Sequence, residues 1–150
     1  MASIEQDIKQ SHFVNQQLKA NINIIYTAHW LTTKITAVLK PYLLTHEQFN
    51  VLRILKGKHP ECMCQKDILH RMVAPSSNLT LLVKKLVTKK MIAVKVSTVD
   101  KREYMINITR TGLNTLDKLE KVLNPEQMRY SELTEKEASQ LSNLLDKLRS

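Results

Sequence analysis

The side chains with the clearest capacity for chemistry in this sequence are basic, and they gather in its middle. Residues 43–111 carry 13 lysines and arginines against five acids, which is +8 of the net +9 of the chain. Lys84 and Lys85 are adjacent, and Asp100, Lys101 and Arg102 form a short charged run. Lysine and arginine neutralise phosphates and release condensed counterions, so this concentration of charge favours a polyanionic partner. A solvated lysine surface is the alternative.

Histidine and cysteine side chains that could bind a metal or react with oxidants also occur here. His59, Cys62, Cys64 and His70 are suitable zinc donors, but their spacing fits no standard zinc pattern, so we predict no metal and no cofactor. A disulfide between Cys62 and Cys64 would be strained, which favours free thiols and a reducing compartment, the cytoplasm. A regulator that responds to thiol oxidation or to a metal through these two cysteines is kept as an alternative.

The sequence lacks the motifs of common enzyme classes. It has no nucleophile motif, phosphate-binding loop or paired-carboxylate pattern, and Gly57 and Gly112 are isolated. We therefore expect no enzymatic activity. The first residues are polar and lack the apolar stretch of a signal peptide, and no run approaches the roughly 18 apolar residues of a membrane span. No membrane partner is expected.

The basic groups need a scaffold, and the apolar pattern predicts that it begins with a long helix. Residues 5–40 contain no glycine or proline, and their apolar residues recur at helical spacing. We predict one long helix, or two divided near Ser11, ending before Pro41. A stripe of this length exceeds what a 150-residue monomer can bury, so part of it is expected to meet a second chain.

Three shorter helices are predicted next. Thr45 starts the first, which Gly57 and Pro60 end, and the second spans 65–72 after a short connector, 62–64. The third is capped by Ser76 or Ser77. Its core-facing stripe consists of Leu79, Leu82, Val83, Leu86 and Val87. Its opposite face, free of acids as a helix between two rows of phosphates requires, carries Ser77, Leu81, Lys84, Lys85 and Thr88.

A hairpin and two more helices complete the predicted order. Apolar residues alternate in 92–96 and 104–108, which predicts two strands joined by a charged loop, 98–102. Thr109 opens a helix that Pro125 ends or bends, and a capping box of Thr134 with Glu137 opens the last. The last helix carries the stripe Leu141, Leu144, Leu145 and Leu148. This order predicts a mainly α (α+β) winged helix-turn-helix with long N-terminal and C-terminal helices, and double-stranded DNA as its first candidate partner.

Five short motifs in this order resemble the MarR family of bacterial transcription regulators. They are Leu44-Thr45-His46-Glu47-Gln48-Phe49, Ser77-Asn78-Leu79-Thr80, Met91-Ile92, Asp100-Lys101-Arg102 and Ile108-Thr109-Arg110-Thr111-Gly112. One departure is Lys90, where the family often has glycine. A lysine there either weakens the end of the preceding helix or adds a phosphate contact.

The resemblance implies a homodimeric transcriptional repressor that binds an inverted repeat in double-stranded DNA and is released by a small-molecule effector. In one domain, 1–150, residues 5–42 and 112–150 would supply dimerisation helices and residues 43–111 the DNA-binding lobe. Arg102 would enter the minor groove, with Asp100 holding its guanidinium. The DNA-binding residues implied are Ser76, Ser77, Asn78, Thr80, Leu81, Lys84, Lys85, Asp100, Lys101 and Arg102.

The resemblance also implies an effector pocket between the dimer helices and the DNA-binding lobe. Tyr26, His29, Trp30 and Tyr42 are the aromatic and polar residues of that region. Packing of the dimer core explains Tyr26 and Trp30 equally well. A winged helix that binds protein is a further alternative, and its binding would weaken less with salt than DNA binding does.

Overall fold

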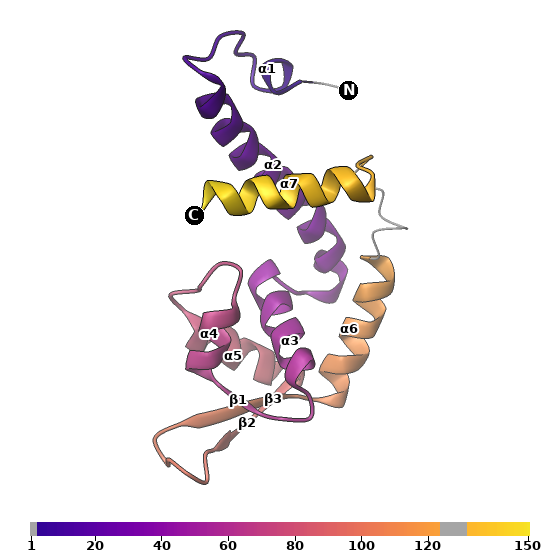
Figure 1. Ribbon diagram of the computed structural model, residues 1–150. Coiled ribbons are helices and arrows are strands. Elements are labelled where there is room, and N and C mark those ends of the chain that lie inside the picture. Colours follow the sequence, from indigo (N-terminus) through magenta and orange to yellow (C-terminus); the bar gives the residue numbers. More distant parts are fainter. Residues whose placement is uncertain (1–2, 124–131) are drawn as a thin grey trace.

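The structure is a computed structural model that describes residues 3–123 and 132–150, and it consists of a long helix leading into a winged-helix lobe (Figure 1). Its elements are α1 Ile4–Asp7, α2 Gln16–Leu39, the 3-10 helix η1 Lys40–Tyr42, α3 His46–Lys58, β1 Met63–Cys64, α4 Gln65–Arg71, α5 Leu79–Thr88, β2 Ile92–Val96, β3 Tyr104–Ile108, α6 Arg110–Val122 and α7 Glu135–Leu148. This order confirms the predicted mainly α winged helix-turn-helix. Pro125, predicted to end or bend α6, lies outside the described residues.

The N-terminal segment forms two helices, in agreement with the predicted alternative of a division near Ser11. α1 ends at Asp7, and α2 begins after Asn15, whose Oδ1 accepts a hydrogen bond from the backbone N–H of Leu18 at 2.8 Å. An asparagine cap of this kind satisfies an N–H that has no partner within the helix. An ion pair of 2.5 Å between Glu5 and Lys19 holds α1 against α2.

The hydrophobic core lies in the winged-helix lobe, where α3 contacts α4, α5, α6 and β3. Fully buried side chains come from every layer of the lobe and include Leu52, Ile68, Leu86, Ile106 and Leu116. Burying an aliphatic side chain of this size contributes roughly 1.5–3 kcal/mol, so the buried residues of the core together hold the lobe in place.

Charged groups add a second connection between α3 and α6. The ammonium of Lys56 lies 2.7 Å from a carboxylate oxygen of Glu120 and 3.0 Å from one of Asp117. The hydrogen bonds that Lys56 donates to these two carboxylates raise its pKa, and the bond to Glu120 has the larger effect. The first part of the predicted C-terminal dimerisation segment thus also packs on the lobe.

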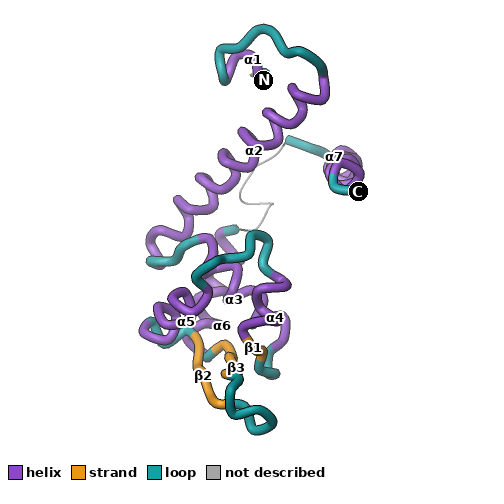
Figure 2. The backbone as a smooth tube through the Cα atoms, turned by 90° about the vertical axis from the view of Figure 1, so that its left-hand side faces the viewer, coloured by secondary structure: helices purple, strands orange, loops and turns teal. Residues whose placement is uncertain are grey.

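The sheet has three antiparallel strands in the order β1-β3-β2. β2 and β3 form the predicted hairpin, with Ile92 opposite Ile108, and β1 adds the pair Met63 and Ile106. The outer part of the hairpin extends beyond the helices (Figure 2). For this reason Val96, one of the alternating apolar residues of the first strand, is 50% exposed.

Several helices end at a residue other than glycine in the left-handed conformation. Lys90, with φ 57°, follows α5. The N–H of Lys90 donates to the carbonyl of Val87 at 2.8 Å, and the N–H of Met91 donates to that of Leu86 at 3.1 Å. These bonds form a Schellman motif, so the helix end is clean despite the lysine, at the energetic cost of a left-handed side-chain-bearing residue. Leu43, with φ 54°, ends η1 in the same conformation.

The start of α5 differs from the prediction. Its N-cap is Asn78 rather than Ser76 or Ser77, because the chain becomes helical only at Leu79. The hydroxyl of Ser76 instead accepts the backbone N–H of Asn78 at 3.2 Å, forming a local turn before the helix.

Two further predictions on helices are wrong. Val87 is 41% exposed, so the core-facing stripe of α5 is limited to Leu79, Leu82, Val83 and Leu86. Gly57 does not end α3, which continues to Lys58, because a single helical glycine costs only about 1 kcal/mol.

The helices outside the lobe leave apolar side chains exposed. Ile25 of α2 is 71% exposed, and α7, which has the predicted capping box of Thr134 and Glu137, buries none of its residues. Leu144 of α7 is 64% exposed. α7 crosses in front of α2 in Figure 1 but stands to one side of it in Figure 2, so the two helices do not lie side by side. Among the described helices, none is long and apolar enough to cross a membrane.

Candidate nucleic-acid interface

The outer face of α5 presents hydroxyl, amide and ammonium groups to solvent. Because its apolar stripe packs into the lobe, the residues about half a turn away point outward. The structure brings the predicted helix residues together there, with Ser76 half-buried and the others exposed, namely Ser77, Asn78, Thr80, Leu81, Lys84 and Lys85. The face has no carboxylate, so a phosphate approaching it meets only neutral or positive groups.

Hydrogen bonds fix α5 at both ends. Thr80 Oγ1 donates to Gln65 Oε1 of α4 at 3.3 Å. After the helix, Thr109 donates twice, from Oγ1 to the carbonyl of Lys90 at 2.7 Å and from its N–H to that of Met91 at 3.0 Å. α5 is therefore held to α4 at its start, and the residues that follow α5 are held to Thr109, the N-cap of α6.

The tip of the β2–β3 hairpin, the wing, is held by its own hydrogen bonds. The N–H of Ser97 donates to the carbonyl of Glu103 at 2.8 Å, and that of Glu103 donates to the carbonyl of Asp100 at 2.9 Å. Lys101 and Arg102 are exposed at this tip. Two cations thus extend from a structured loop, where each could reach a phosphate or the minor groove.

Asp100 does not hold the guanidinium of Arg102 as predicted. Its Oδ1 accepts the backbone N–H of Arg102 at 2.9 Å, and no ion pair between described residues joins these two side chains. An aspartate in a turn commonly binds the N–H two residues on, which leaves the following side chain in solvent.

A groove of about 380 Å³ lies between the start of α4, α5 and the wing, and it connects the two predicted parts of the interface. It is lined by Cys64, Gln65, Lys66, Thr80, Arg102, Glu103 and Tyr104. The prediction missed Gln65, Lys66 and Tyr104, because no local pattern indicates which residues of α4 and β3 face α5. For Lys66, the only signal available in the sequence was its positive charge, two residues after Cys64.

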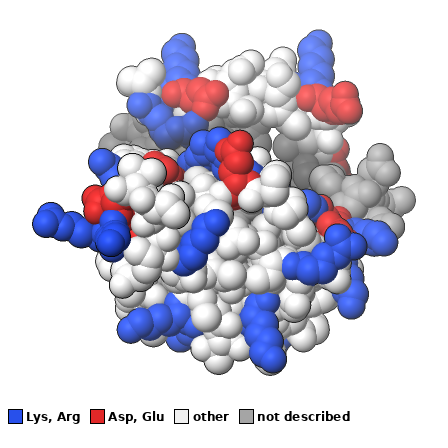
Figure 3. Space-filling model, turned by 90° about the horizontal axis from the view of Figure 1, so that it is seen from below, with Lys and Arg blue, Asp and Glu red and all other residues white. Residues whose placement is uncertain are grey.

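Positive charge continues around the lower end of the molecule. Figure 3, which views it from below, shows lysine and arginine side chains projecting along the left, right and lower margins, with acids mainly in the upper half. Acids are also present near these cations, and Glu103 is one of them because it lines the groove.

The two cysteines are free and half-buried. Cys64 is the second residue of β1, so its side chain points to the face of the strand opposite that of Met63. Within 3–123 and 132–150, no group of three or more histidine, cysteine or acidic side chains could hold a metal ion. Cys64 lines the groove beside the wing, and Cys62 does not.

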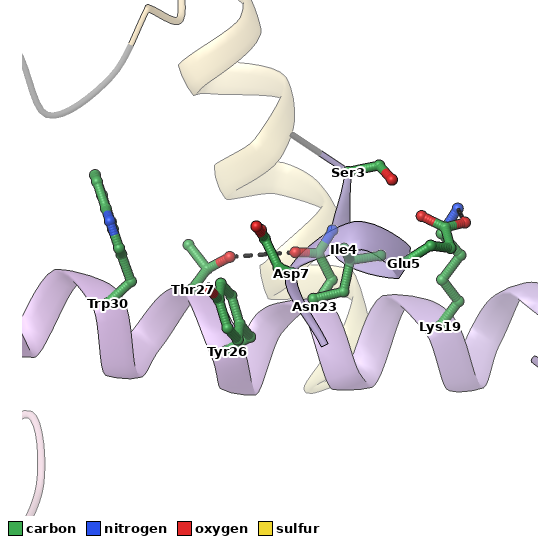
Figure 4. Close-up of a pocket in the computed structure, with 9 residues that line it drawn as sticks. All are labelled: Ser3, Ile4, Glu5, Asp7, Lys19, Asn23, Tyr26, Thr27 and Trp30. Atoms are coloured by element: carbon green, nitrogen blue, oxygen red, sulfur yellow. Dashed lines mark hydrogen bonds and ion pairs between the residues drawn. The ribbon is translucent and has the colours of Figure 1, made fainter. Parts of the chain in front are cut away.

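A second hollow, of about 520 Å³, lies between α1 and the first half of α2 (Figure 4). Tyr26 and Trp30 rise from α2 into it, and Asp7 faces them from α1. The ion pair of Glu5 and Lys19 lines the other end of the hollow. Between this pair and the aromatic rings, Thr27 Oγ1 donates to Asn23 Oδ1 at 3.3 Å. The hollow thus combines aromatic faces with hydroxyl, amide and carboxylate groups.

The four residues predicted for an effector pocket are not all brought together. Tyr26 and Trp30 line the hollow between α1 and α2, whereas His29 is exposed on α2 outside it. Tyr42 packs against the core of the lobe at the other end of α2. Helical spacing alone could not show that α1 folds back over Tyr26 and Trp30.

The chain matches the model of a known sequence family. The model of the family described as transcriptional regulator SarA/Rot matches residues 33–119, from the end of α2 through most of α6. This is more than half of the chain. A search of curated proteins gave no match.

Solved structures with the same arrangement are numerous. A mutant of E. coli MarR in complex with operator DNA is 20% identical, with a TM-score of 0.79 over 92% of this chain and 99% of that chain. S. aureus MepR in a DNA complex is 25% identical, with a TM-score of 0.73 over 91% and 97%. A MarR-like transcription regulator from Bacillus cereus ATCC 10987 is 20% identical, with a TM-score of 0.76 over 89% and 96%.

Proposed function

Because this chain belongs to the SarA/Rot family of transcriptional regulators, we propose that it is a sequence-specific double-stranded DNA-binding protein that acts as a homodimeric repressor. Its structural neighbours include MarR and MepR, as the resemblance to the MarR family predicted, and they are regulators rather than enzymes. Repression would follow from exclusion of polymerase at the bound site.

The observation that carries the proposal is the acid-free outer face of α5 beside a cationic wing tip. Lys84 and Lys85 are exposed on α5, and Lys101 and Arg102 are exposed on the wing, with the groove between them. We expect α5 to lie in the major groove, with residues 76–81 near base edges and the lysines at phosphates, and the wing in the adjacent minor groove.

The proposed dimer uses the apolar faces that the described chain leaves uncovered. These are the exposed stripe of α2, with Ile25, and that of α7, with Leu144. We therefore propose that residues 5–42 and 112–150 form the dimerisation segments and that residues 43–111 form the DNA-binding lobe. In such a dimer the two DNA half-sites would lie about 34 Å apart, which is one turn of DNA. Leu144→Asp should therefore halve the mass measured by light scattering, while Val99→Asp, at an exposed wing position, should leave it unchanged.

The DNA-binding proposal is tested by fluorescence anisotropy with duplexes from the upstream region of the gene, titrated at several salt concentrations. Lys84→Ala should weaken binding and lower the salt slope by about 0.9, the value for one phosphate contact. Lys118→Ala removes the same charge from an exposed position on α6 and should leave the slope unchanged. Arg102→Ala should weaken binding through loss of the minor-groove contact.

Equal and weak binding to operator-region and unrelated duplexes, with no effect of Lys84→Ala, would contradict this orientation on DNA. That outcome would favour a protein partner for the winged helix instead.

A small-molecule effector is proposed to bind in the hollow between α1 and α2. The support is the convergence of Tyr26, Trp30 and Asp7 on one space of about 520 Å³. Trp30 is the only tryptophan of the chain, so its fluorescence reports directly on the hollow. Titration with phenolic and carboxylic compounds should change this fluorescence in the wild type and in His29→Ala, and Tyr26→Ala should abolish the response.

A further inference from the structure

Lys89 differs from the other lysines of α5 in where its ammonium lies. Lys84 and Lys85 are exposed, whereas Lys89, the C-cap of the helix, is half-buried. Its Nζ donates to the carbonyl oxygen of Leu43 and, at 3.2 Å, to Oε1 of Gln48. Both acceptors lie at the corner where the chain passes from α2 through η1 into α3.

The acceptors at this corner are themselves held in place. Gln48 is 2% exposed, and its Oε1 also accepts the backbone N–H of Thr45 at 3.2 Å as part of the capping box of α3. Leu43 is the left-handed residue that ends η1. The Lys89 ammonium is therefore directed toward two acceptors whose positions the corner fixes.

The environment of Lys89 is unfavourable for an unpaired charge. Its hydrogen-bond partners are neutral, and burial, followed by the nearby charge of Lys85, lowers the pKa of Lys89. An ammonium remains away from water only when its hydrogen bonds offset the loss of hydration. The side chain is thus held inward, although a lysine at the end of a DNA-facing helix could easily extend into solvent.

This contact has a direction that the apolar core lacks. Hydrophobic contacts between α5 and the lobe are non-directional and tolerate small rotations of the helix, whereas a hydrogen bond depends on distance and angle. The contact of Lys89 joins the end of α5 to the corner that connects α2 with α3. It therefore specifies the orientation of α5 relative to α2.

We propose that Lys89 is a positioning residue for DNA recognition: its ammonium does not meet DNA but sets the orientation of α5 relative to α2, and with it the spacing of the two DNA-facing helices in a dimer. The proposal rests on the DNA-binding function proposed above. A dimer must fit two half-sites at once, so an error in spacing weakens binding to the paired site and leaves a single half-site almost unaffected.

The test compares Lys89→Met with Lys85→Met. Both remove one charge and keep an unbranched side chain, but Lys85 lies on the exposed outer face. The probes are a duplex that the wild-type protein selects from a random-sequence library and a version with one half-site scrambled.

We expect Lys89→Met to lose about ten-fold in affinity for the full duplex, as for one charged hydrogen bond, with little change on the half-site and an unchanged salt slope. Lys85→Met should weaken binding to both probes and lower the salt slope by about 0.9. The proposal is overturned if Lys89→Met lowers the slope as Lys85→Met does, if it weakens both probes equally, or if it leaves binding unchanged.

Hydrogen exchange of the amides at residues 43–48 separates this proposal from the DNA-binding proposal. If the wild type selects no duplex, DNA binding fails as the function; unchanged exchange in Lys89→Met then also overturns the positioning role, and faster exchange at the corner supports it. If Lys89→Met does not fold at the assay temperature, Lys89→Arg replaces it. The larger guanidinium should disturb the same contact and give the same selective loss on the full duplex.

Discussion

Replacing Gly112 by alanine should destabilise the fold, because α6 begins in direct contact with the end of the α5–β2 connection. A Cβ at residue 112 would lie 2.3 Å from the carbonyl oxygen of Met91 and 2.7 Å from Cγ1 of Ile108. The Met91 carbonyl cannot simply move away, because it accepts the N–H of Thr109 at 3.0 Å. Room for the methyl group requires a shift of backbone on one side of this contact.

The magnitude follows from two opposing terms. Inserting a methyl group into a filled site costs roughly 1–3 kcal/mol, and losing one backbone hydrogen bond costs about 1 kcal/mol. Alanine in a helix is favoured over glycine by about 1 kcal/mol. The net effect of Gly112→Ala is a loss of about 2 kcal/mol, which for a chain of this length lowers the melting temperature by roughly 4–8 °C.

Gly57 provides a matched control within the same protein. It lies in α3, and a Cβ added there meets nothing within 4 Å. Gly57→Ala should therefore stabilise by about 1 kcal/mol and raise the melting temperature by roughly 2–4 °C. Both variants are measured by thermal and urea unfolding at one protein concentration, because the stability of the proposed dimer would depend on concentration.

The reasoning is refuted if Gly112→Ala is as stable as the wild type. It is equally refuted if Gly57→Ala loses as much stability as Gly112→Ala, because the effect would then come from the loss of glycine in general and not from the contact with Met91.

Three further expectations concern caps and ion pairs. Lys90→Gly should raise the free energy of unfolding by roughly 0.5–1 kcal/mol in urea titrations, since glycine adopts the left-handed conformation without strain; a loss of stability would show that the lysine side chain makes a compensating contact. Thr109→Val should lower it by about 1–2 kcal/mol, because Oγ1 accepts the N–H of Gly112 at 3.2 Å as the cap of α6; unchanged unfolding would mean that water replaces the cap. The hydrogen bond with Lys19 lowers the pKa of Glu5 in the folded chain, so its stabilisation of α1 is present above the ordinary value of 4.5 and is lost as the pH falls through the lower folded value. Trp30 fluorescence should report this acid transition in the wild type, and Glu5→Gln should remove that part of it.

The sequence predicted best those features that short-range interactions decide. The starts of α3, α6 and α7 follow from Thr45, Thr109 and Thr134, because each cap bonds to an N–H three residues along the chain. The hairpin follows from the alternation of apolar residues in its two strands. The same alternation sets the register in which Ile92 pairs with Ile108.

Features that depend on distant contacts were not predictable in the same way. The contact of Lys89 with Leu43 joins residues 46 positions apart, and nothing near Lys89 distinguishes it from the exposed lysines beside it. The hollow at Trp30 depends on α1 folding back onto α2, and the groove at Tyr104 depends on where α4 meets the wing. Val87 illustrates a third cause, since a helix in a small lobe buries a narrower stripe than its apolar pattern offers.

The position of β2 at one edge of the sheet has a consequence for the behaviour of the protein in solution. Its outer N–H and C=O groups face no strand of the sheet, and Val94 and Val96 are 39% and 50% exposed. An edge of this kind can pair with the same edge of another molecule and begin aggregation. Lys95 places a charge between the two valines, a common means by which native edges oppose such pairing. Replacing Lys95 by an uncharged residue is therefore expected to promote aggregation even though the fold of each molecule is intact.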